Sequence, residues 1–156
     1  MLKKIKPYII SLLIPLAVGG LSAFLTRGNM NLYSEITTPP LAPPSLLFPI
    51  VWTVLYILMG ISSLMIYKAG VSSKQRTSAL STYASSLIVN FAWSIIFFNF
   101  KAFFLAFVWL ILLFFLVIRT ILEYKEINKR AAYLQIPYAV WVAFAGYLSF
   151  SIWLLN

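Results

Sequence analysis

The amino-acid sequence predicts an all-α integral membrane protein, built as a bundle of five transmembrane helices. Hydrophobic residues make up 62% of the 156 positions and charged residues only 10%, whereas soluble domains carry about 25% charged residues. The mean hydropathy is +0.94. Five apolar stretches reach the length of about 20 residues that one membrane crossing needs. They occupy roughly residues 7–27, 45–67, 77–99, 102–122 and 132–155, so we expect residues 1–156 to form a single domain.

The basic residues predict how the chain is oriented in the membrane. The net charge is +9, but the basic residues are unevenly shared between the two ends of the spans. Most of them lie at the N-terminus and at the second and fourth connections, namely Lys3, Lys4, Lys6, Lys68, Lys74, Arg76, Arg119, Lys125, Lys129 and Arg130. The other connections hold only Arg27 and Lys101. Because basic loops face the cytoplasm, we expect a plasma-membrane protein with a cytoplasmic N-terminus, an outer C-terminus and no nucleic-acid partner.

The first span admits two interpretations. Its lysine-rich start and the sequence Leu21-Ser22-Ala23 loosely fit a cleaved signal peptide. The apolar stretch is longer than the core of a typical signal, so we interpret it as an uncleaved span. Small residues on one face would let a neighbouring helix approach closely; they are Pro15, Gly19, Ser22 and Thr26.

Prolines are concentrated in the connection that leads to the second span, at Pro39, Pro40, Pro43 and Pro44. Proline favours stiff, extended backbone and restricts the residue before it. Together with the apolar side chains of Leu41, Leu47 and Phe48, this stiffness favours an outer loop that acts as a lid over an internal pocket. The alternative is a surface linker that ends at a helix capped by Ser45.

Three spans carry aromatic and polar side chains at intervals of three or four residues, which places them on one helical face. These stripes are Phe48, Trp52, Tyr56 and Gly60 in the second span, Tyr83, Ser86, Asn90, Trp93 and Phe97 in the third, and Gln135, Tyr138, Trp141, Ala145 and Ser149 in the fifth. Helix packing alone would explain any single stripe. At about 1.5 Å per residue, however, Trp52, Asn90 and Ser149 lie at one level, roughly 9–12 Å below the outer surface. Ala145 lies one turn deeper and Trp141 about two, so the three stripes together predict an aromatic pocket in the outer leaflet.

The fourth span is apolar around its whole circumference and is predicted to face lipid. In the third span, small residues permit close contact with another helix; they are Ser78, Ser81, Thr82 and Ser85. We therefore expect a homodimer formed through the third and fourth spans.

The residue types that are missing exclude several kinds of chemistry. The chain contains no cysteine, histidine or aspartate, and its only acids are Glu35, Glu123 and Glu126. A thiol nucleophile, a Ser-His-Asp triad, a zinc site and a histidine-ligated haem are therefore excluded within this chain. We expect no metal and no intrinsic cofactor. None of the glutamates lies at mid-membrane, where proton-coupled transporters usually hold an ionisable group.

Three segments resemble signature segments of the TSPO family, the translocator proteins, also called tryptophan-rich sensory proteins or peripheral-type benzodiazepine receptors. The segments are PPLAPPSLLFPIVWTVLYILMG, YASSLIVNFAWSIIFF and PYAVWVAFAGYLSFSIWLLN. The resemblance, to a bacterial member, implies five tilted helices, a homodimer and a pocket closed by the first loop. It also implies binding of porphyrins, such as protoporphyrin IX and haem-related tetrapyrroles, and of isoquinoline carboxamides and benzodiazepines.

The resemblance also implies a ligand site. The family's pocket positions fall on Trp52, Asn90, Trp141, Ala145 and Leu148, with Tyr33, Pro43 and Phe48 of the loop region as further candidates and with Tyr56, Trp93 and Ser149 added from the stripes. Two departures limit what is carried over. Ser149 stands where many members have an asparagine, which weakens any contact made by that side chain. No basic residue follows the tyrosine near the C-terminus, so the sterol motif of animal members is incomplete.

These observations support three functions. The first is a membrane sensor or receptor for tetrapyrroles and aromatic drugs, because an aromatic pocket suits a flat macrocycle. The second is oxygen- and light-dependent degradation of protoporphyrin, with the porphyrin as substrate and with Trp52 and Trp141 as redox partners. The third is a carrier of porphyrins or other hydrophobic molecules. The sequence leaves the physiological ligand open.

Overall fold

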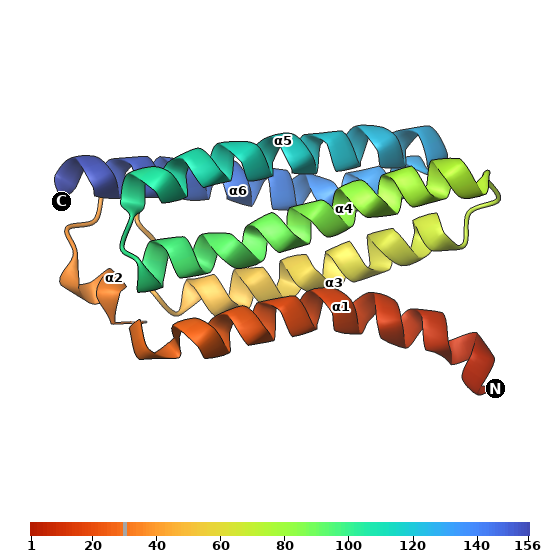
Figure 1. The fold of residues 1–156 in the computed structure, drawn as a ribbon, viewed down its shortest axis with the longest axis horizontal. Coiled ribbons are helices and arrows are strands. Elements are labelled where there is room, and N and C mark those ends of the chain that lie inside the picture. The colour runs from red at the N-terminus through yellow and green to blue at the C-terminus, as the bar shows by residue number, and fades with distance from the viewer. Residues whose placement is uncertain (30) are drawn as a thin grey trace.

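Five long helices run side by side along the length of the molecule (Figure 1). The computed structural model describes residues 1–29 and 31–156. The long helices are α1 (Leu2–Thr26), α3 (Leu47–Tyr67), α4 (Ser73–Ser94), α5 (Phe103–Ile127) and α6 (Lys129–Leu155). Each lies in a helical segment that is long and apolar enough to cross a membrane, and no strand is found in the described part of the chain. The structure thus confirms the predicted five-helix membrane bundle.

Three short helical segments complete the fold near one end of the bundle. The 3₁₀ turn η1 (Arg27–Asn29) and the one-turn helix α2 (Leu32–Glu35) follow α1. A π-helical turn, η2 (Ile95–Asn99), extends α4. Single π turns within α-helices are rare and occur frequently at functional sites. The Asn99 side chain joins this turn to α1, because its amide donates to the Leu25 carbonyl over 3.2 Å.

Several helices extend further than the apolar stretches predicted, although α3 does not. Helix α4 begins at Ser73 and α6 at Lys129, each several residues before the predicted start. The Ser72 hydroxyl accepts a hydrogen bond from the Gln75 amide at 3.1 Å, and the Asn128 side chain accepts one from the Arg130 amide at 3.0 Å. Such polar caps satisfy backbone donors beyond the apolar core of a span. Ser45, in contrast, does not cap α3, because Leu46 occupies the N-cap position.

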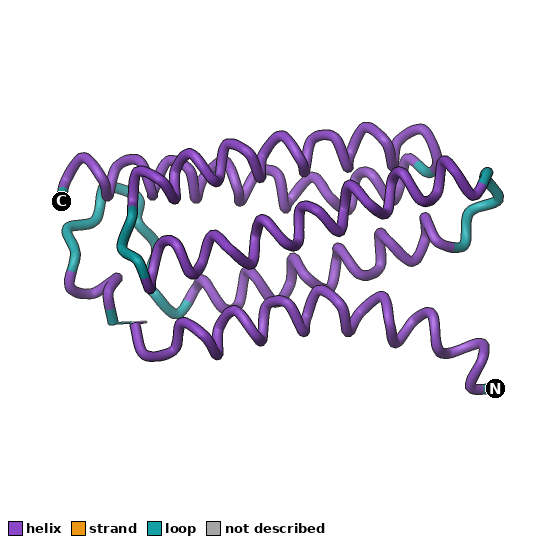
Figure 2. The backbone as a smooth tube through the Cα atoms, viewed as in Figure 1, coloured by secondary structure: helices purple, strands orange, loops and turns teal. Residues whose placement is uncertain are grey.

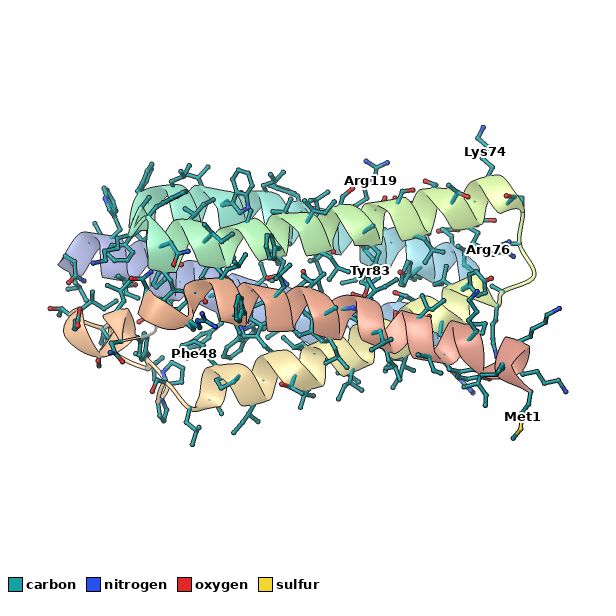
Figure 3. The ribbon with its side chains drawn as sticks, turned by 60° about the horizontal axis from the view of Figure 1, so that its bottom comes forward. Met1, Phe48, Lys74, Arg76, Tyr83 and Arg119 are labelled. Atoms are coloured by element: carbon teal, nitrogen blue, oxygen red, sulfur yellow. The ribbon has the colours of Figure 1, made fainter. Side chains whose placement is uncertain are left out.

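The two ends of the bundle differ in character (Figure 2). The N-terminus lies at the same end as the α3–α4 and α5–α6 connections, which we call the basic end. Lys74 and Arg76 lie near this end in Figure 3. Helix α2, the proline-rich segment and the C-terminus lie at the opposite end, which we call the loop end. The fold therefore brings the basic residues of separate connections together in space, as the predicted topology requires.

Helices α1 and α3 approach each other through two glycines. A Cβ atom at Gly60 would lie 2.7 Å from the Ser11 backbone carbonyl, which is closer than real Cβ atoms come. Gly19 in α1 receives the ring of Tyr56 from α3, and a Cβ atom there would overlap the ring. The predicted small-residue face of the first span is thus a helix contact.

Helix α5 differs from its prediction on one face. Ala106, Leu110, Leu113 and Val117 are buried, and the Trp109 indole donates to the Val89 carbonyl of α4 over 2.8 Å. Phe115, in contrast, is 66% exposed. The predicted contact with lipid therefore fits only the exposed face of this span, because its other face packs inside the bundle. Its composition concealed that face, because the buried and exposed sides are equally apolar.

Part of the small-residue face of α4 contacts α5 of the same chain. The hydroxyls of Ser78 and Thr82 donate to the Glu123 carboxylate over 2.9 and 2.7 Å. Arg119 completes the set with a 3.0 Å salt bridge to the same carboxylate. Ser81 and Ser85 remain exposed. The homodimer through α4 and α5 stays a prediction, and Ser81 and Ser85 are the residues of that face that are free for it.

We predict that Gly60→Ala lowers the free energy of unfolding, because the added methyl group forces α1 away from α3. Overpacking of this kind costs about 1–3 kcal/mol. Thermal unfolding in detergent measures the effect. Gly146→Ala is the matched control, because a Cβ atom at Gly146 meets nothing within 4 Å. Equal unfolding temperatures for the two variants would contradict the close contact.

Candidate functional site

A cavity of about 350 Å³ lies among the helices towards the loop end, within the size range of small-molecule pockets. Helices α1, α2, α3, α4 with η2, and α6 all contribute to its wall, whereas α5 does not. None of the lining residues is charged. The cavity is therefore an uncharged and mostly apolar space between the inward faces of the helices.

One side of the cavity is an aromatic series that joins α2, α3 and α6. The ring of Tyr33 meets the ring of Phe48 edge-on, with centroids 5.1 Å apart. Phe48 in turn meets Trp141 at 5.8 Å, and Trp141 lies 5.5 Å from Phe144. Edge-to-face contacts at such distances are favourable beyond the area they bury. These rings hold the start of α3 against the middle of α6.

A second aromatic group lies deeper, towards the basic end. Trp52 stacks on Tyr56 with centroids 5.5 Å apart and an interplanar angle of 27°. The ring of Tyr138 lies 6.3 Å from Trp52. The Tyr56 hydroxyl accepts a 3.3 Å hydrogen bond from the side-chain amide of Asn90. Tyr56 is thereby positioned by α1, α3 and α4 together.

These contacts change the predicted depths of the residues. The sequence placed Trp141 well below Trp52, but Trp141 contacts Phe48 at the very start of α3. Tyr138, about one turn earlier in α6 and nearer the basic end, is the ring beside Trp52. The predicted depth of Trp141 relative to Trp52 is therefore wrong, because α6 continues past the start of α3 towards the loop end (Figure 1). The stagger brings Trp141 into the upper part of the cavity.

Three polar atoms in the cavity wall have no hydrogen-bond partner within the described residues. They are the indole nitrogens of Trp93 and Trp141 and the hydroxyl oxygen of Ser149. Trp93 and Ser149 are buried, and unpaired buried donors are uncommon in folded proteins. An indole N–H can only donate. These three polar atoms are buried within the wall and do not face the open cavity.

The proline-rich segment is fastened across the loop end at several points. The Tyr33 hydroxyl donates to the Pro43 carbonyl over 2.7 Å, and the Tyr147 hydroxyl donates to the Pro40 carbonyl over 2.8 Å. Asn156 at the end of the chain bonds both backbone groups of Thr37, at 3.1 and 2.9 Å. The segment is thus tied to α2 and to the C-terminal end of α6.

Burial raises the pKa of the Tyr33 phenol above its ordinary value of 10.0. The phenol therefore keeps its proton, and its bond to Pro43, throughout the neutral range. A folded-state pKa that is raised means that this contact is complete below pH 10.0 and is lost as the pH rises through the raised pKa.

The apolar side chains of the proline-rich segment are placed differently from the prediction. Leu41 is 83% exposed and has a positive φ of 70°, and Leu47 is also exposed. Of these three predicted apolar side chains, only Phe48 lines the cavity. Leu41 and Leu47 therefore do not close the pocket from above. None of residues 37–44 lines the cavity, whose wall near the loop end is formed by Tyr33, Ser45, Phe48 and Pro49.

The structure brings most of the candidate site residues together. Those that line the cavity are Tyr33, Phe48, Trp52, Tyr56, Trp93, Trp141, Ala145, Leu148 and Ser149. Pro43 and Asn90 lie outside the lining, where they bond Tyr33 and Tyr56 respectively. Pro43 and Asn90 therefore help to position Tyr33 and Tyr56, which do line the cavity.

Sequence reasoning missed the contribution of α1 to the wall. Leu16, Gly19, Gly20 and Ala23 line the cavity, although only helix packing was predicted for this span. The adjacent glycines Gly19 and Gly20 were the only feature of the sequence that could have indicated that α1 lines a cavity. A Cβ atom at Gly20 would meet nothing within 4 Å, so packing does not require glycine there.

A membrane bundle of five helices around an uncharged aromatic cavity is the class of protein that the fold and the site define. The sequence matches the TspO/MBR family over residues 11–154. The chain therefore belongs to this family, which confirms the resemblance seen in the sequence.

Individual relatives cover most of the chain. The translocator protein of Bos taurus is 36% identical over 90% of this chain and 85% of its own length. The tryptophan-rich protein TspO of Archaeoglobus fulgidus is 36% identical over 94% of both chains. The TspO of Chlorobaculum tepidum is 33% identical over 86% of this chain and 85% of its own. The similarity thus spans both the cavity and the proline-rich segment.

We predict that the double variant Tyr33→Phe, Tyr147→Phe opens the proline-rich segment without unfolding the bundle. Each lost hydrogen bond contributes about 0.5–1.5 kcal/mol, so loop opening rises roughly tenfold or more. Amide hydrogen exchange at Thr38, Leu41 and Ala42 measures it. Tyr133→Phe, at an exposed position of α6, is the control. Unchanged exchange would mean that the prolines alone hold the segment in place.

Proposed function

We propose that the cavity binds flat aromatic molecules, namely tetrapyrroles such as protoporphyrin IX and haem-related compounds, and drug-like isoquinoline carboxamides and benzodiazepines. The observation that carries this proposal is the cavity wall itself. Its aromatic rings offer stacking surface from several helices, and none of its lining residues is charged, which suits a flat apolar molecule.

Binding of this kind makes the protein a membrane receptor or sensor. The basic end faces the cytoplasm under the positive-inside rule, so the cavity opens towards the outer side of the plasma membrane. A ligand enters when the proline-rich segment moves aside. Thr37 of that segment bonds Asn156 at the end of α6. Movement of the segment on ligand entry would therefore change the contacts at the membrane surface, where a partner could detect the change.

A second candidate function is light- and oxygen-dependent breakdown of bound protoporphyrin. Trp52 and Trp141 support it, because both line the cavity and both stand in ring contact with further aromatic residues. The lining residues include no carboxylate, imidazole or thiol. The porphyrin would absorb the light and activate oxygen, while the protein orients it and supplies oxidisable indoles.

One experiment separates binding from breakdown. Protoporphyrin absorbance is followed with purified protein in light and in darkness, each with and without oxygen. A static spectral shift in all four conditions supports a receptor. Loss of the porphyrin band with a new product, only in light and oxygen, supports the enzyme. A third candidate, a carrier, predicts movement of porphyrin across vesicles that hold the protein. Absence of any spectral shift would contradict porphyrin binding altogether.

We predict that Trp52→Phe and Trp141→Phe reduce porphyrin turnover more than porphyrin affinity. Phenylalanine keeps most of the stacking area but is harder to oxidise than indole. We expect turnover to fall by about tenfold or more and affinity by less than about threefold. Trp153→Phe is the matched control, because Trp153 is 42% exposed and does not line the cavity. Equal losses of affinity and turnover would count against a redox role.

We also predict that replacing Pro39, Pro40, Pro43 and Pro44 by alanine weakens binding of aromatic ligands. A stiff segment loses less conformational entropy when a ligand orders it. Ordering costs about 1–2 kcal/mol per residue, of which only part is recovered here, so we expect a loss of roughly 1–3 kcal/mol, or one to two decades in affinity. Pro7→Ala, in the first turns of α1 near the basic end, is the control. If the affinity stayed unchanged while hydrogen exchange showed a looser segment, the prolines would serve only as a linker.

A further inference from the structure

A second group of polar side chains lies between the cavity and the basic end. Its members come from four helices and are all buried: Ser62 and Ser63 from α3, Tyr83 and Ser86 from α4, Tyr124 from α5, and Gln135 and Tyr138 from α6. We call them the inner polar cluster. None of its members lines the cavity, and the proposed function uses none of them.

Part of the inner polar cluster is satisfied by direct contacts. The Ser62 hydroxyl donates to the Ala131 carbonyl over 2.7 Å. The side-chain amide of Gln135 donates to the Ser62 oxygen over 3.2 Å. The hydroxyls of Ser63 and Tyr124 lie 2.9 Å apart. These bonds join α3 to α5 and to α6.

The same bonds leave one amide oxygen without a partner. Ser62 has a single O–H group, which it gives to the Ala131 carbonyl, so its oxygen can only accept from Gln135. Gln135 must therefore present its NH₂ group to Ser62, whichever way the amide is drawn. Its oxygen Oε1 then faces the interior with no hydrogen-bond partner in the described chain, on a residue that is 0% exposed.

Two tyrosine hydroxyls of the cluster also lack a hydrogen-bond partner. Tyr138 is 1% exposed and Tyr83 is 6% exposed, and neither hydroxyl has a direct partner among the described residues. The Tyr138 hydroxyl has Ser86 and Asn90 as polar neighbours. Ser86, however, directs its own hydroxyl to the Tyr83 carbonyl at 2.6 Å.

The Tyr83 hydroxyl is likewise near Ser63, whose hydroxyl is in contact with Tyr124. Both tyrosine hydroxyls therefore have polar neighbours but no direct hydrogen-bond partner among the described residues. Polar groups that do not bond one another directly can be bridged by a water molecule.

We propose that the inner polar cluster binds ordered water molecules, which bridge Tyr138 to Ser86 and Asn90, bridge Tyr83 to Ser63, and donate to Gln135 Oε1. Membrane interiors supply no other partner for such groups. The cluster consists of neutral hydroxyls and an amide and includes no carboxylate or base, which suits a dipolar neutral ligand rather than an ion. Buried waters typically bind several otherwise unpaired polar groups at once.

The site connects with the cavity through Asn90. Its amide bonds the Tyr56 hydroxyl, and Tyr56 lines the cavity. Bound water would therefore continue a hydrogen-bonded column from the inner end of the cavity to Ser63 and Tyr124. This inference does not rest on the proposed function, because it holds whether or not the cavity contains a ligand.

Thermal unfolding of the full chain in detergent tests the proposal through Tyr138→Phe and Tyr83→Phe. A dry, unpaired hydroxyl destabilises the fold, and its removal with retention of the ring would raise the unfolding temperature. A water-bound hydroxyl stabilises the fold, so we expect the unfolding temperature of each variant to fall by about 2–4 °C. Tyr133→Phe, whose ring is 57% exposed, should not shift. A rise in both cluster variants would overturn the proposal.

Infrared spectroscopy supplies a second readout that does not depend on stability. We expect a narrow O–H band of bound water in the difference between wild type and Tyr138→Phe. The band should shift in H₂¹⁸O and be absent from the difference between wild type and Tyr133→Phe. If Tyr138→Phe does not fold, Tyr83→Phe takes its place. A difference spectrum without an ¹⁸O-sensitive band would also overturn the proposal.

Discussion

The contact between the Tyr56 ring and Gly19 sets the spacing of α1 and α3, and the cavity depends on that spacing. Glycine has no Cβ atom, so the aromatic ring can lie directly against the backbone of α1. The same ring stacks on Trp52, and its hydroxyl accepts from Asn90. Tyr56 therefore joins three helices at the inner end of the cavity. A side chain at position 19 would displace the ring, and the cavity wall would move with it.

The membrane imposes the second constraint, because a buried polar group has no bulk water to bond. The bundle meets this constraint differently in its two halves. Towards the loop end, the helices present aromatic rings to an uncharged cavity. Towards the basic end, the same helical faces present hydroxyls and an amide to one another. The stripe of α4 and its extension η2 shows the change along one segment, from Tyr83 and Ser86 to Trp93 and Phe97.

The loop end combines stiffness with a small number of contacts. Prolines restrict the backbone of the segment, while hydrogen bonds from Tyr33 and Tyr147 hold two of its carbonyls. Leu41 adopts a positive φ that leucine disfavours, which indicates that the surrounding contacts determine the path. A segment held in this way can move as a unit when a few bonds break.

The sequence by itself determined the number of spans, the basic end and the inward faces of three helices. These are local properties, since hydropathy depends on stretch length and a helical face depends on spacing along one chain segment. Helix ends were placed less well, because polar caps such as Ser72 and Asn128 extend a helix beyond its apolar core.

Only the tertiary structure decided the buried face of α5, the part played by α1 in the cavity wall, and the stagger between α3 and α6. That stagger places Trp141 beside Phe48 and Tyr138 beside Trp52. A helical stripe keeps its periodicity when its helix slides along the bundle axis. Contacts between residues far apart in the chain, such as that of Asn156 with Thr37, are therefore what sets the relative depth of the site residues.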